Sequence, residues 1–237
     1  MTMRRSRSAQ RAHPAANQRP ARLAVLLVVV CGVLAYANSI HGPFIFDDRR
    51  AVLENPTIRE LWPISAVLHP PRQTPVAGRP ISNLSFAINY AAGGLDIAGY
   101  HIWNIGVHIL AALALSGIVR MTGIWAAPDA DRTTTDRLAL VCTLVWVLHP
   151  LNSEAVNYLT QRTELMVGLF YLLTMYAAIT AHRSARPRRW AMAAVVSNFC
   201  GIATKESMVT APLMVKSGCR NGAGHRIGVG RKHRRGG

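Results

Sequence analysis

The sequence predicts an all-α protein, a polytopic bundle of transmembrane helices. Half of its residues are hydrophobic and only 16% are charged, which fits neither a typical soluble domain nor a disordered chain. The apolar residues gather in uncharged runs that are long enough to form membrane helices. The net charge of +16 lies mainly at the two ends of the chain, so the middle of the chain is nearly neutral.

The first membrane helix is expected over residues 23–40. Those 18 residues would form a helix about 27 Å long, which is enough to cross the hydrocarbon core of a bilayer. Arginines crowd residues 1–22 and predict a basic cytoplasmic tail. A cleaved signal peptide is the alternative, because Ala35-Tyr36-Ala37 resembles a cleavage site. Both interpretations put the following segment outside the cytoplasm.

A long outer loop is expected over residues 41–99, which are polar and rich in proline. Short helices over residues 58–68 and 81–93 are expected to lie along the membrane surface. The second of them carries a weak apolar stripe at helical spacing, made of Ile81, Leu84, Ile88 and Ala91.

Further apolar segments follow this loop. The segment over residues 138–148 has only 11 residues, so it either begins inside the polar turn expected over residues 120–137 or crosses only part of the membrane. The loop over residues 182–189 is purely basic and is expected inside, which puts residues 149–163 outside. The segments are 102–119, 138–148, 165–181, 190–203 and 208–215, of which the last two make one or two segments broken by Lys205-Glu206. Residues 23–215 are expected to form one membrane-embedded domain.

The chain ends in a tail, residues 216–237, that is rich in glycine and arginine and contains no acid. Two interpretations stay open: a disordered basic tail, or out-of-frame translation that truncates a longer protein. Nucleic-acid binding is not expected, because no basic patch interleaved with aromatic residues lines a folded region.

Asp47 and Asp48 follow directly after an aromatic-rich turn in the outer loop. A paired acid at this place has two interpretations. Aspartate favours helix caps and turns, so the pair can be structural. At a membrane-surface cleft it can instead supply a general base or a metal ligand.

The second membrane segment carries His101, Asn104 and His108 at a spacing that puts them on one helix face. Polar residues on such a helix usually face a bundle interior or a cavity. Interhelical hydrogen bonding and contact with a ligand are both consistent with this pattern. One metal ion held by both histidines is not expected, because they are about 10 Å apart along the helix axis.

Other polar residues are expected at the outer face: His149, Glu154, Arg162 and the Lys205-Glu206 pair. Glu154 can be an acid favoured by a helix N-terminus, and Arg162 an arginine that snorkels at the interface. Alternatively Arg162, with His149 and Glu154 nearby, holds a lipid phosphate. Lys205 either pairs with an acid or provides a second phosphate contact.

Four stretches occur in an order that resembles a known family: FIFDDRRAVLENP, RPISNLSFAINYAAGGLDIAGYHIWNIGVHILAAL, LHPLNSEAVNYLTQRTELMVGLFYLL and ATKESMVTAPLMV. Together they resemble the membrane region of the transmembrane and tetratricopeptide-repeat protein O-mannosyltransferases and their bacterial relatives. Those enzymes belong to the GT-C class of integral-membrane glycosyltransferases.

The resemblance implies a donor sugar on a polyprenyl phosphate and a hydroxyl acceptor, often on protein, at the extracytoplasmic face of the bacterial inner membrane or the endoplasmic reticulum. It implies that Asp47 and Asp48 supply the catalytic base and that Glu154 and Arg162 help to hold the donor phosphate. No cofactor is implied, and a divalent metal stays possible.

The chain departs from that family in two respects. It has fewer membrane segments, and it shows no 34-residue helical repeat. Two other functions therefore stay open: a non-catalytic membrane protein or inactive fragment, and an ion or proton transporter that uses Asp47, His101 and His108.

Overall fold

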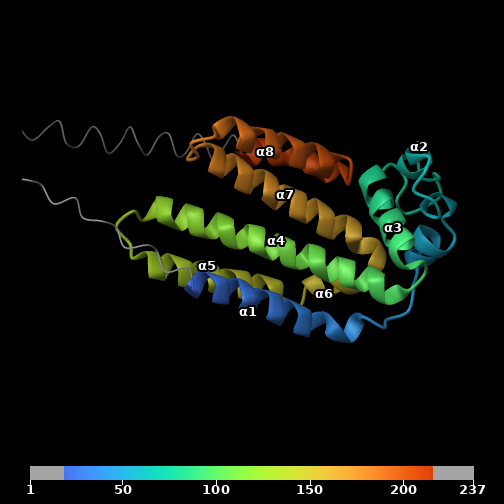
Figure 1. Cartoon of the computed structure of the whole chain (residues 1–237), viewed down its shortest axis with the longest axis horizontal. Helices are drawn as coiled ribbons and strands as arrows, with labels where there is room; N and C mark the ends of the chain where they lie inside the picture. Colours follow the sequence, from blue (N-terminus) through green and yellow to red (C-terminus); the bar gives the residue numbers. More distant parts are fainter. Residues whose placement is uncertain (1–18, 216–237) are drawn as a thin grey trace, which may run out of the picture.

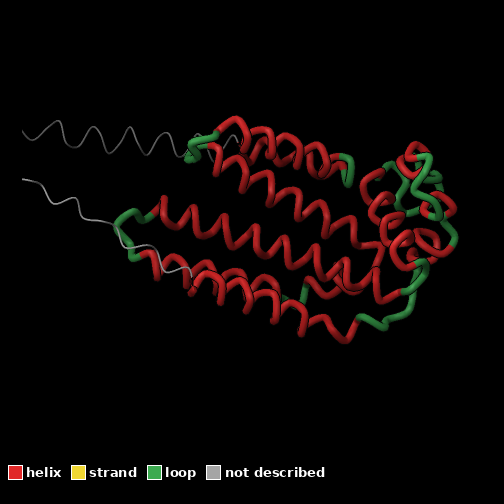
Figure 2. The backbone as a smooth tube through the Cα atoms, viewed as in Figure 1, coloured by secondary structure: helices red, strands yellow, loops and turns green. Residues whose placement is uncertain are grey.

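Five helices lie along the long axis of the chain in the computed structural model, whose described residues are 19–215 (Figure 1). Helix α4 lies at the centre of the bundle and packs against α1, α5 and α7, while α8 packs against α7. Helices alone make up the regular structure of these residues, so the predicted all-α fold class is confirmed (Figure 2). The five are α1 (Arg19–Tyr36), α4 (Ile97–Ala126), α5 (Arg132–Val147), α7 (Arg162–Ala181) and α8 (Pro187–Ile202).

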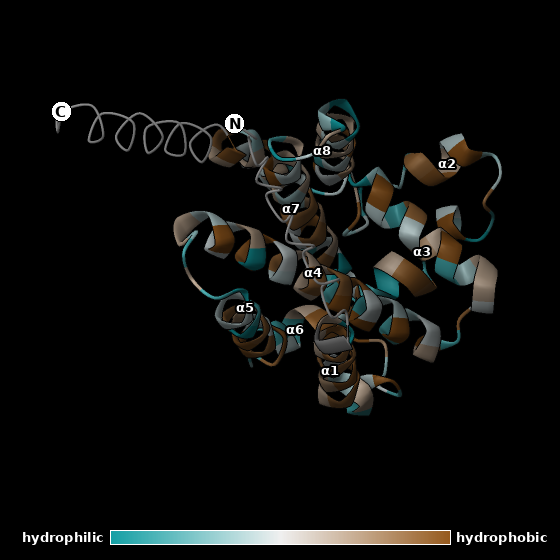
Figure 3. Cartoon of the chain, turned by 60° about the vertical axis from the view of Figure 1, so that its left-hand side comes forward, coloured by the Kyte–Doolittle hydropathy of each residue, from teal (hydrophilic) through white to brown (hydrophobic). Residues whose placement is uncertain are grey.

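Three stretches of helix are long and apolar enough to cross a membrane: Ala21–Ser39, Ile97–Ala126 and Leu159–Ala181. They mark the chain as a membrane protein. Apolar residues, drawn in brown, run along α1 and α7 in Figure 3. On α1 and α8 many apolar side chains are exposed, as is expected of helices whose outer surface meets lipid. On α1 they include Leu23, Leu26, Val30 and Leu34, and on α8 Met192, Val196 and Phe199.

The turn between α4 and α5 is much shorter than predicted. Helix α4 continues to Ala126 and α5 begins at Arg132, so only residues 127–131 connect them, and the polar turn expected over 120–137 is wrong. Asp131 starts α5, because its side chain accepts a hydrogen bond from the backbone N–H of Thr133 at 3.3 Å. The short apolar segment 138–148 is thus the second half of a longer helix, which was one of the two predicted possibilities.

A capping region, residues 40–96, covers one end of the bundle (Figure 1). The other end carries the α4–α5 and α7–α8 turns. The capping region has its own apolar core, which includes Val52, Ile58, Val67 and Phe86 and is completed by Tyr100 of α4. Its elements are η2 (Arg49–Leu53), η3 (Pro56–Ile58), α2 (Ile64–Leu68) and α3 (Pro80–Gly93).

The helix predicted over residues 58–68 is only half correct. Helix α2 begins at Ile64, directly after Pro63, while residues 59–62 are not helical. The residue before a proline is disfavoured in the helical region, so Trp62 cannot continue a helix into Pro63.

Helix α3 agrees in position with the segment predicted over residues 81–93, but the weak apolar stripe noted there is not its buried face. Ile88 is 39% exposed and Ala91 is also exposed. Polar side chains are buried in their place, and Ser82, Asn83 and Ser85 find hydrogen-bond partners inside the protein. The buried residues of α3 are Ser82, Asn83, Ser85, Phe86, Ala87 and Asn89.

Asn83 joins three parts of the capping region. Its amide nitrogen donates to the hydroxyl of Thr57 at 2.9 Å and to the carbonyl of Val67 at 2.7 Å, and its amide oxygen accepts from Asn55 at 2.8 Å. Asn55 and Asn83 are both fully buried. The two asparagines of the ENP and RPISN stretches therefore hold the loop to α3.

Asn83→Ala is expected to lower the free energy of unfolding by roughly 2–3 kcal/mol, because it leaves the buried Val67 carbonyl and Asn55 amide, and the half-buried Thr57 hydroxyl, short of a partner. The melting temperature of the detergent-purified protein measures this. Asn157→Ala, at an exposed site on α6 (Asn152–Asn157), is the matched control. Equal melting temperatures for the two variants would contradict the structural role of Asn83.

Candidate functional site

The junction between the capping region and the bundle holds the predicted acid pair. Residues 45–48 form a tight turn that is closed by a hydrogen bond from the Asp48 backbone N–H to the Ile45 carbonyl at 2.9 Å. Phe46, inside the turn, has a φ of 43°. The turn gives the two adjacent aspartates opposite environments: Asp48 is 1% exposed, and Asp47 is exposed.

Asp48 fastens the turn to a segment more than a hundred residues away. One carboxylate oxygen accepts from the backbone N–H and the hydroxyl of Thr160, at 2.8 and 2.6 Å. The other accepts from the backbone N–H of Ile45 at 3.1 Å. Three donors thus occupy this carboxylate, which makes Asp48 a structural clamp rather than a free base.

Asp47 has a carboxylate without a hydrogen-bond or ion-pair partner among residues 19–215, and a fixed backbone. Its N–H donates to the phenol oxygen of Tyr158 at 3.0 Å. Burial, with the nearby Asp47 and Asp48 carboxylates, raises the pKa of Tyr158 above its ordinary value, so the phenol stays protonated at neutral pH. The arrangement presents one carboxylate to the outside on a turn that is held at both neighbouring positions.

Arg162, at the start of α7, is fully buried, so the interpretation of an arginine that snorkels at the interface is wrong. Its Nε donates to the side chain of Asn104 at 2.8 Å. Its terminal nitrogens donate to the carbonyls of Tyr100 and Ser85, at 3.0 and 3.3 Å. The guanidinium carbon also lies 4.4 Å from the centre of the Phe86 ring, a cation–π contact.

No ion pair involves Arg162 among residues 19–215, where every acceptor it contacts is neutral. Asp48 is the carboxylate that interacts electrostatically with it. A buried positive charge therefore lies behind the acid pair, at the point where α3, α4 and α7 meet.

The three polar residues predicted to share a face of α4 are all buried, but they have different surroundings. Asn104 accepts from Arg162 and donates to the Val156 carbonyl at 3.3 Å. The Nε2 atom of His108 lies 3.1 Å from the Val147 carbonyl on α5, which is the interhelical hydrogen bond considered from the sequence. His101 lies against the backbone of Gly42 in the capping region.

Glu154 and His149 are exposed at the same end of the bundle. Glu154 lies in the first turn of α6, where a helix N-terminus favours an acid. The Nδ1 atom of His149 accepts from the backbone N–H of Leu151 at 3.3 Å, in the turn between α5 and α6. Both stay predictions as donor contacts.

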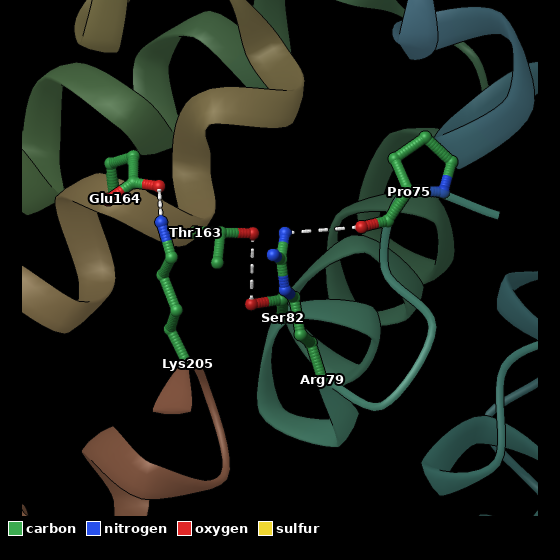
Figure 4. A network of polar contacts seen from close by, with 6 residues as sticks. All are labelled: Pro75, Arg79, Ser82, Thr163, Glu164 and Lys205. Carbon is green, nitrogen blue, oxygen red and sulfur yellow. Dashed lines mark hydrogen bonds and ion pairs between the residues drawn. The ribbon is translucent and has the colours of Figure 1, made fainter. Parts of the chain in front are cut away.

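Lys205 forms an ion pair with Glu164 of α7, a partner that the sequence did not suggest (Figure 4). In the same view the hydroxyl of Thr163 donates to that of Ser82 at 3.3 Å, and Arg79 donates to the Pro75 carbonyl at 3.2 Å. These contacts join α3, α7 and the segment after α8. Lys205 thus has the structural role considered from the sequence, and a phosphate contact would have to displace Glu164 or share the ammonium group with it.

Within residues 19–215, no three His, Cys, Asp or Glu side chains gather in a way that could hold a metal ion. The site prediction also missed Phe46, Tyr158 and Thr160. The last two lie in the quoted stretch NYLTQR, directly before Arg162, which is the only signal that could have pointed to them.

Curated proteins from several animals match the chain at low identity. Protein O-mannosyl-transferase TMTC4 of Mus musculus is 28% identical over 163 residues, 64% of this chain and 22% of the relative. Protein O-mannosyl-transferase Tmtc1 of Drosophila melanogaster is 29% identical over 199 residues, 78% of this chain and 21% of the relative. Protein O-mannosyl-transferase tmtc2 of Xenopus laevis is 29% identical over 201 residues, 79% of this chain and 23% of the relative.

The chain resembles protein O-mannosyl-transferases. The resemblance predicted from the four ordered stretches is therefore confirmed. The chain spans about a fifth of the length of these relatives. No family model matches the chain, and no solved structure matches it.

Proposed function

We propose that the chain is part of a GT-C-type glycosyltransferase. It moves a mannose-like sugar from a polyprenyl-phosphate donor to a hydroxyl group, on a protein acceptor, at the extracytoplasmic face of a membrane. The observation that carries the proposal is the exposed carboxylate of Asp47, held on a clamped turn at the end of a bundle of apolar helices. The names of the similar proteins support the reaction class.

Asp47 is the general base in this proposal. Its carboxylate takes the proton of the acceptor hydroxyl while the hydroxyl oxygen attacks C1 of the sugar. The bond between C1 and the phosphate oxygen breaks, and polyprenyl phosphate leaves. Asp48 is a positioning residue, because its three internal hydrogen bonds fix the turn that carries Asp47.

Arg162 acts through its field in this proposal. A buried cation in a low-dielectric environment stabilises negative charge that develops nearby without touching it. Its three hydrogen bonds to Asn104, Tyr100 and Ser85 hold the charge in place. Glu154, His149 and Lys205 are proposed as contacts for the donor at the same end of the bundle.

The proposed orientation follows from the distribution of basic residues. The end of the bundle away from the capping region carries the α7–α8 turn, with Arg183, Arg186, Arg188 and Arg189 around it. Because cytoplasmic loops are enriched in basic residues, that end is the cytoplasmic one, and the capping region lies outside. The chain then crosses the membrane several times, with the tail of residues 1–22 inside. Residues 1–18 and 216–237 lie outside the described residues.

Sealed membrane vesicles in two orientations test the proposal. Right-side-out vesicles from cells that express the chain are expected to transfer label from externally added radiolabelled polyprenyl-phosphate mannose to protein, above vesicles without the chain. Inverted vesicles are expected to do so only after detergent opens them. Absence of labelled protein from both kinds of vesicle, with and without detergent, would overturn the proposal. Labelling by intact inverted vesicles alone would overturn the proposed face.

A further inference from the structure

Phe46 has an unusual backbone conformation for its type. Its φ of 43° lies in the left-handed region, at the second position of the turn that ends at Asp48. Glycine and asparagine are the residues that such a turn favours, and a bulky residue with positive φ is an outlier. Strain of this kind gathers at functional sites, where the surrounding structure enforces it.

The ring of Phe46 is also unusually exposed. The residue is 83% exposed, although it belongs to a type that is normally buried. Its ring contacts the ring of Tyr158 edge to face, with the centroids 6.4 Å apart and the planes at 81°. This edge-to-face contact orients the ring without covering it. The strained backbone therefore does not serve to bury the side chain.

The groups around Phe46 indicate which kind of ligand its ring can contact. The next residue carries the free carboxylate of Asp47, and Tyr158 contacts both residues. In a polyprenyl-phosphate sugar, the hydrocarbon chain begins on one side of the phosphate and the sugar on the other. When C1 of the sugar lies beside Asp47, the first isoprene units lie a few ångströms away. An exposed phenyl ring at position 46 provides an apolar surface at that distance.

We propose that Phe46 is a substrate-binding residue whose ring packs against the first isoprene units of the lipid-linked donor and so holds the sugar–phosphate bond beside Asp47. This inference rests on the proposed function. The left-handed turn turns the ring outward, Tyr158 fixes its direction, and Asp48 keeps the turn closed.

Photo-cross-linking tests the contact without requiring turnover. The photoreactive residue benzoylphenylalanine replaces Phe46 in the full chain, and radiolabelled polyprenyl-phosphate mannose is added to the membranes. Trp62 is the matched control position, because it is an aromatic residue of the same capping region and is 78% exposed. Label is expected on the chain with the probe at position 46, with several times less at position 62, and unlabelled polyprenyl phosphate is expected to compete. Equal labelling at both positions, or labelling that only excess phospholipid reduces, would mean ordinary contact with the bilayer and would overturn the proposal.

Phe46→Gly separates binding from folding. Glycine accepts positive φ without strain, so the melting temperature is expected to stay equal or to rise. Capture of a photoreactive donor analogue is expected to fall roughly tenfold, about 1.4 kcal/mol of binding free energy. Phe46→Trp is expected to retain capture. A fall in melting temperature that accompanies the loss of capture would indicate a structural role and overturn the proposal.

The two proposals fail separately in these experiments. If the probe at position 46 captures the donor in vesicles that transfer no label, the result supports the donor contact and contradicts the proposed transferase activity. If label is transferred to protein without capture at position 46, the result contradicts only the proposed role of Phe46.

Discussion

Arg162→Met is expected to destabilise the chain by at least about 3 kcal/mol, the largest effect on folding of any single change described here. The guanidinium donates to the Asn104 side chain and to the carbonyls of Tyr100 and Ser85, and all of these acceptors are buried or face the buried side chain. Methionine fills a similar volume but donates no hydrogen bond. Each acceptor left without a partner in a buried site costs about 1–3 kcal/mol.

The loss of charge adds to the loss of hydrogen bonds. Asp48 is 1% exposed, and Arg162 is the buried cation that interacts electrostatically with it. The two side chains form no ion pair, but removing the cation takes a favourable charge interaction away from a carboxylate that is shielded from water, which adds to the destabilisation. Arg162→Lys keeps the charge, but a lysine ammonium cannot reproduce the planar fork that reaches three acceptors. It is therefore expected to restore only part of the stability.

Melting of the detergent-purified variants measures both effects. Arg72→Met, at an exposed site in the capping region, is the control for the loss of one arginine. If Arg162 were only a contact for an external phosphate, Arg162→Met would melt like Arg72→Met and would lose only donor binding. That result would contradict the buried structural role.

The sequence was sufficient to predict the long helices, because their signal is local. Uncharged runs such as residues 23–40 and 165–181 have few alternatives in a membrane, where every backbone polar group needs an internal partner. The helix boundaries were less accurate. Apolar content alone does not mark the polar turns with which α5 begins at Arg132 and α7 at Arg162.

The sequence could not predict which face of α3 is buried. A stripe of apolar residues at helical spacing is the usual sign of a buried face, but α3 exposes Ile88 and buries Asn83. Asn83 is buried because its side chain forms hydrogen bonds with Asn55, Thr57 and the Val67 carbonyl. These partners lie 16 to 28 residues away in the sequence. Such pairings depend on the tertiary fold.

The candidate site was predictable as a set of residues but not as a geometry. Asp47 and Asp48 look equivalent in the sequence, and the hydrogen bonds of Asp48 to Thr160 span 112 residues. The same fold buries Arg162 against Asn104, across 58 residues. Sequence spacing within one helix could relate His101, Asn104 and His108, but it could not relate residues on different helices.

Asp47→Asn is expected to lower transfer of label from polyprenyl-phosphate mannose by roughly a hundredfold to ten-thousandfold, the range for removal of a general base. Its stability is expected to change by less than about 0.5 kcal/mol, because the Asp47 side chain is exposed and its contact with Tyr158 is made by the backbone N–H. Normal expression and melting together with the loss of transfer would separate chemistry from folding.

Asp48→Asn is expected to give the opposite pattern, because an asparagine places an NH₂ group where the carboxylate now accepts hydrogen bonds. One of the donors from Thr160 or Ile45 would then face another donor, and the free energy of unfolding is expected to fall by roughly 2 kcal/mol. Transfer falls in this variant only as far as the turn loosens. Glu54→Gln is the control for the loss of an acid, since Glu54 is exposed and forms a surface ion pair with Arg49 of the capping region. If Asp47→Asn lowers transfer and Asp48→Asn lowers stability, the two neighbouring carboxylates have different roles. The conformation of the turn, rather than the combined charge of the pair, would then produce the site. Full transfer by the Asp47→Asn variant would instead leave the acid pair as a turn without chemistry.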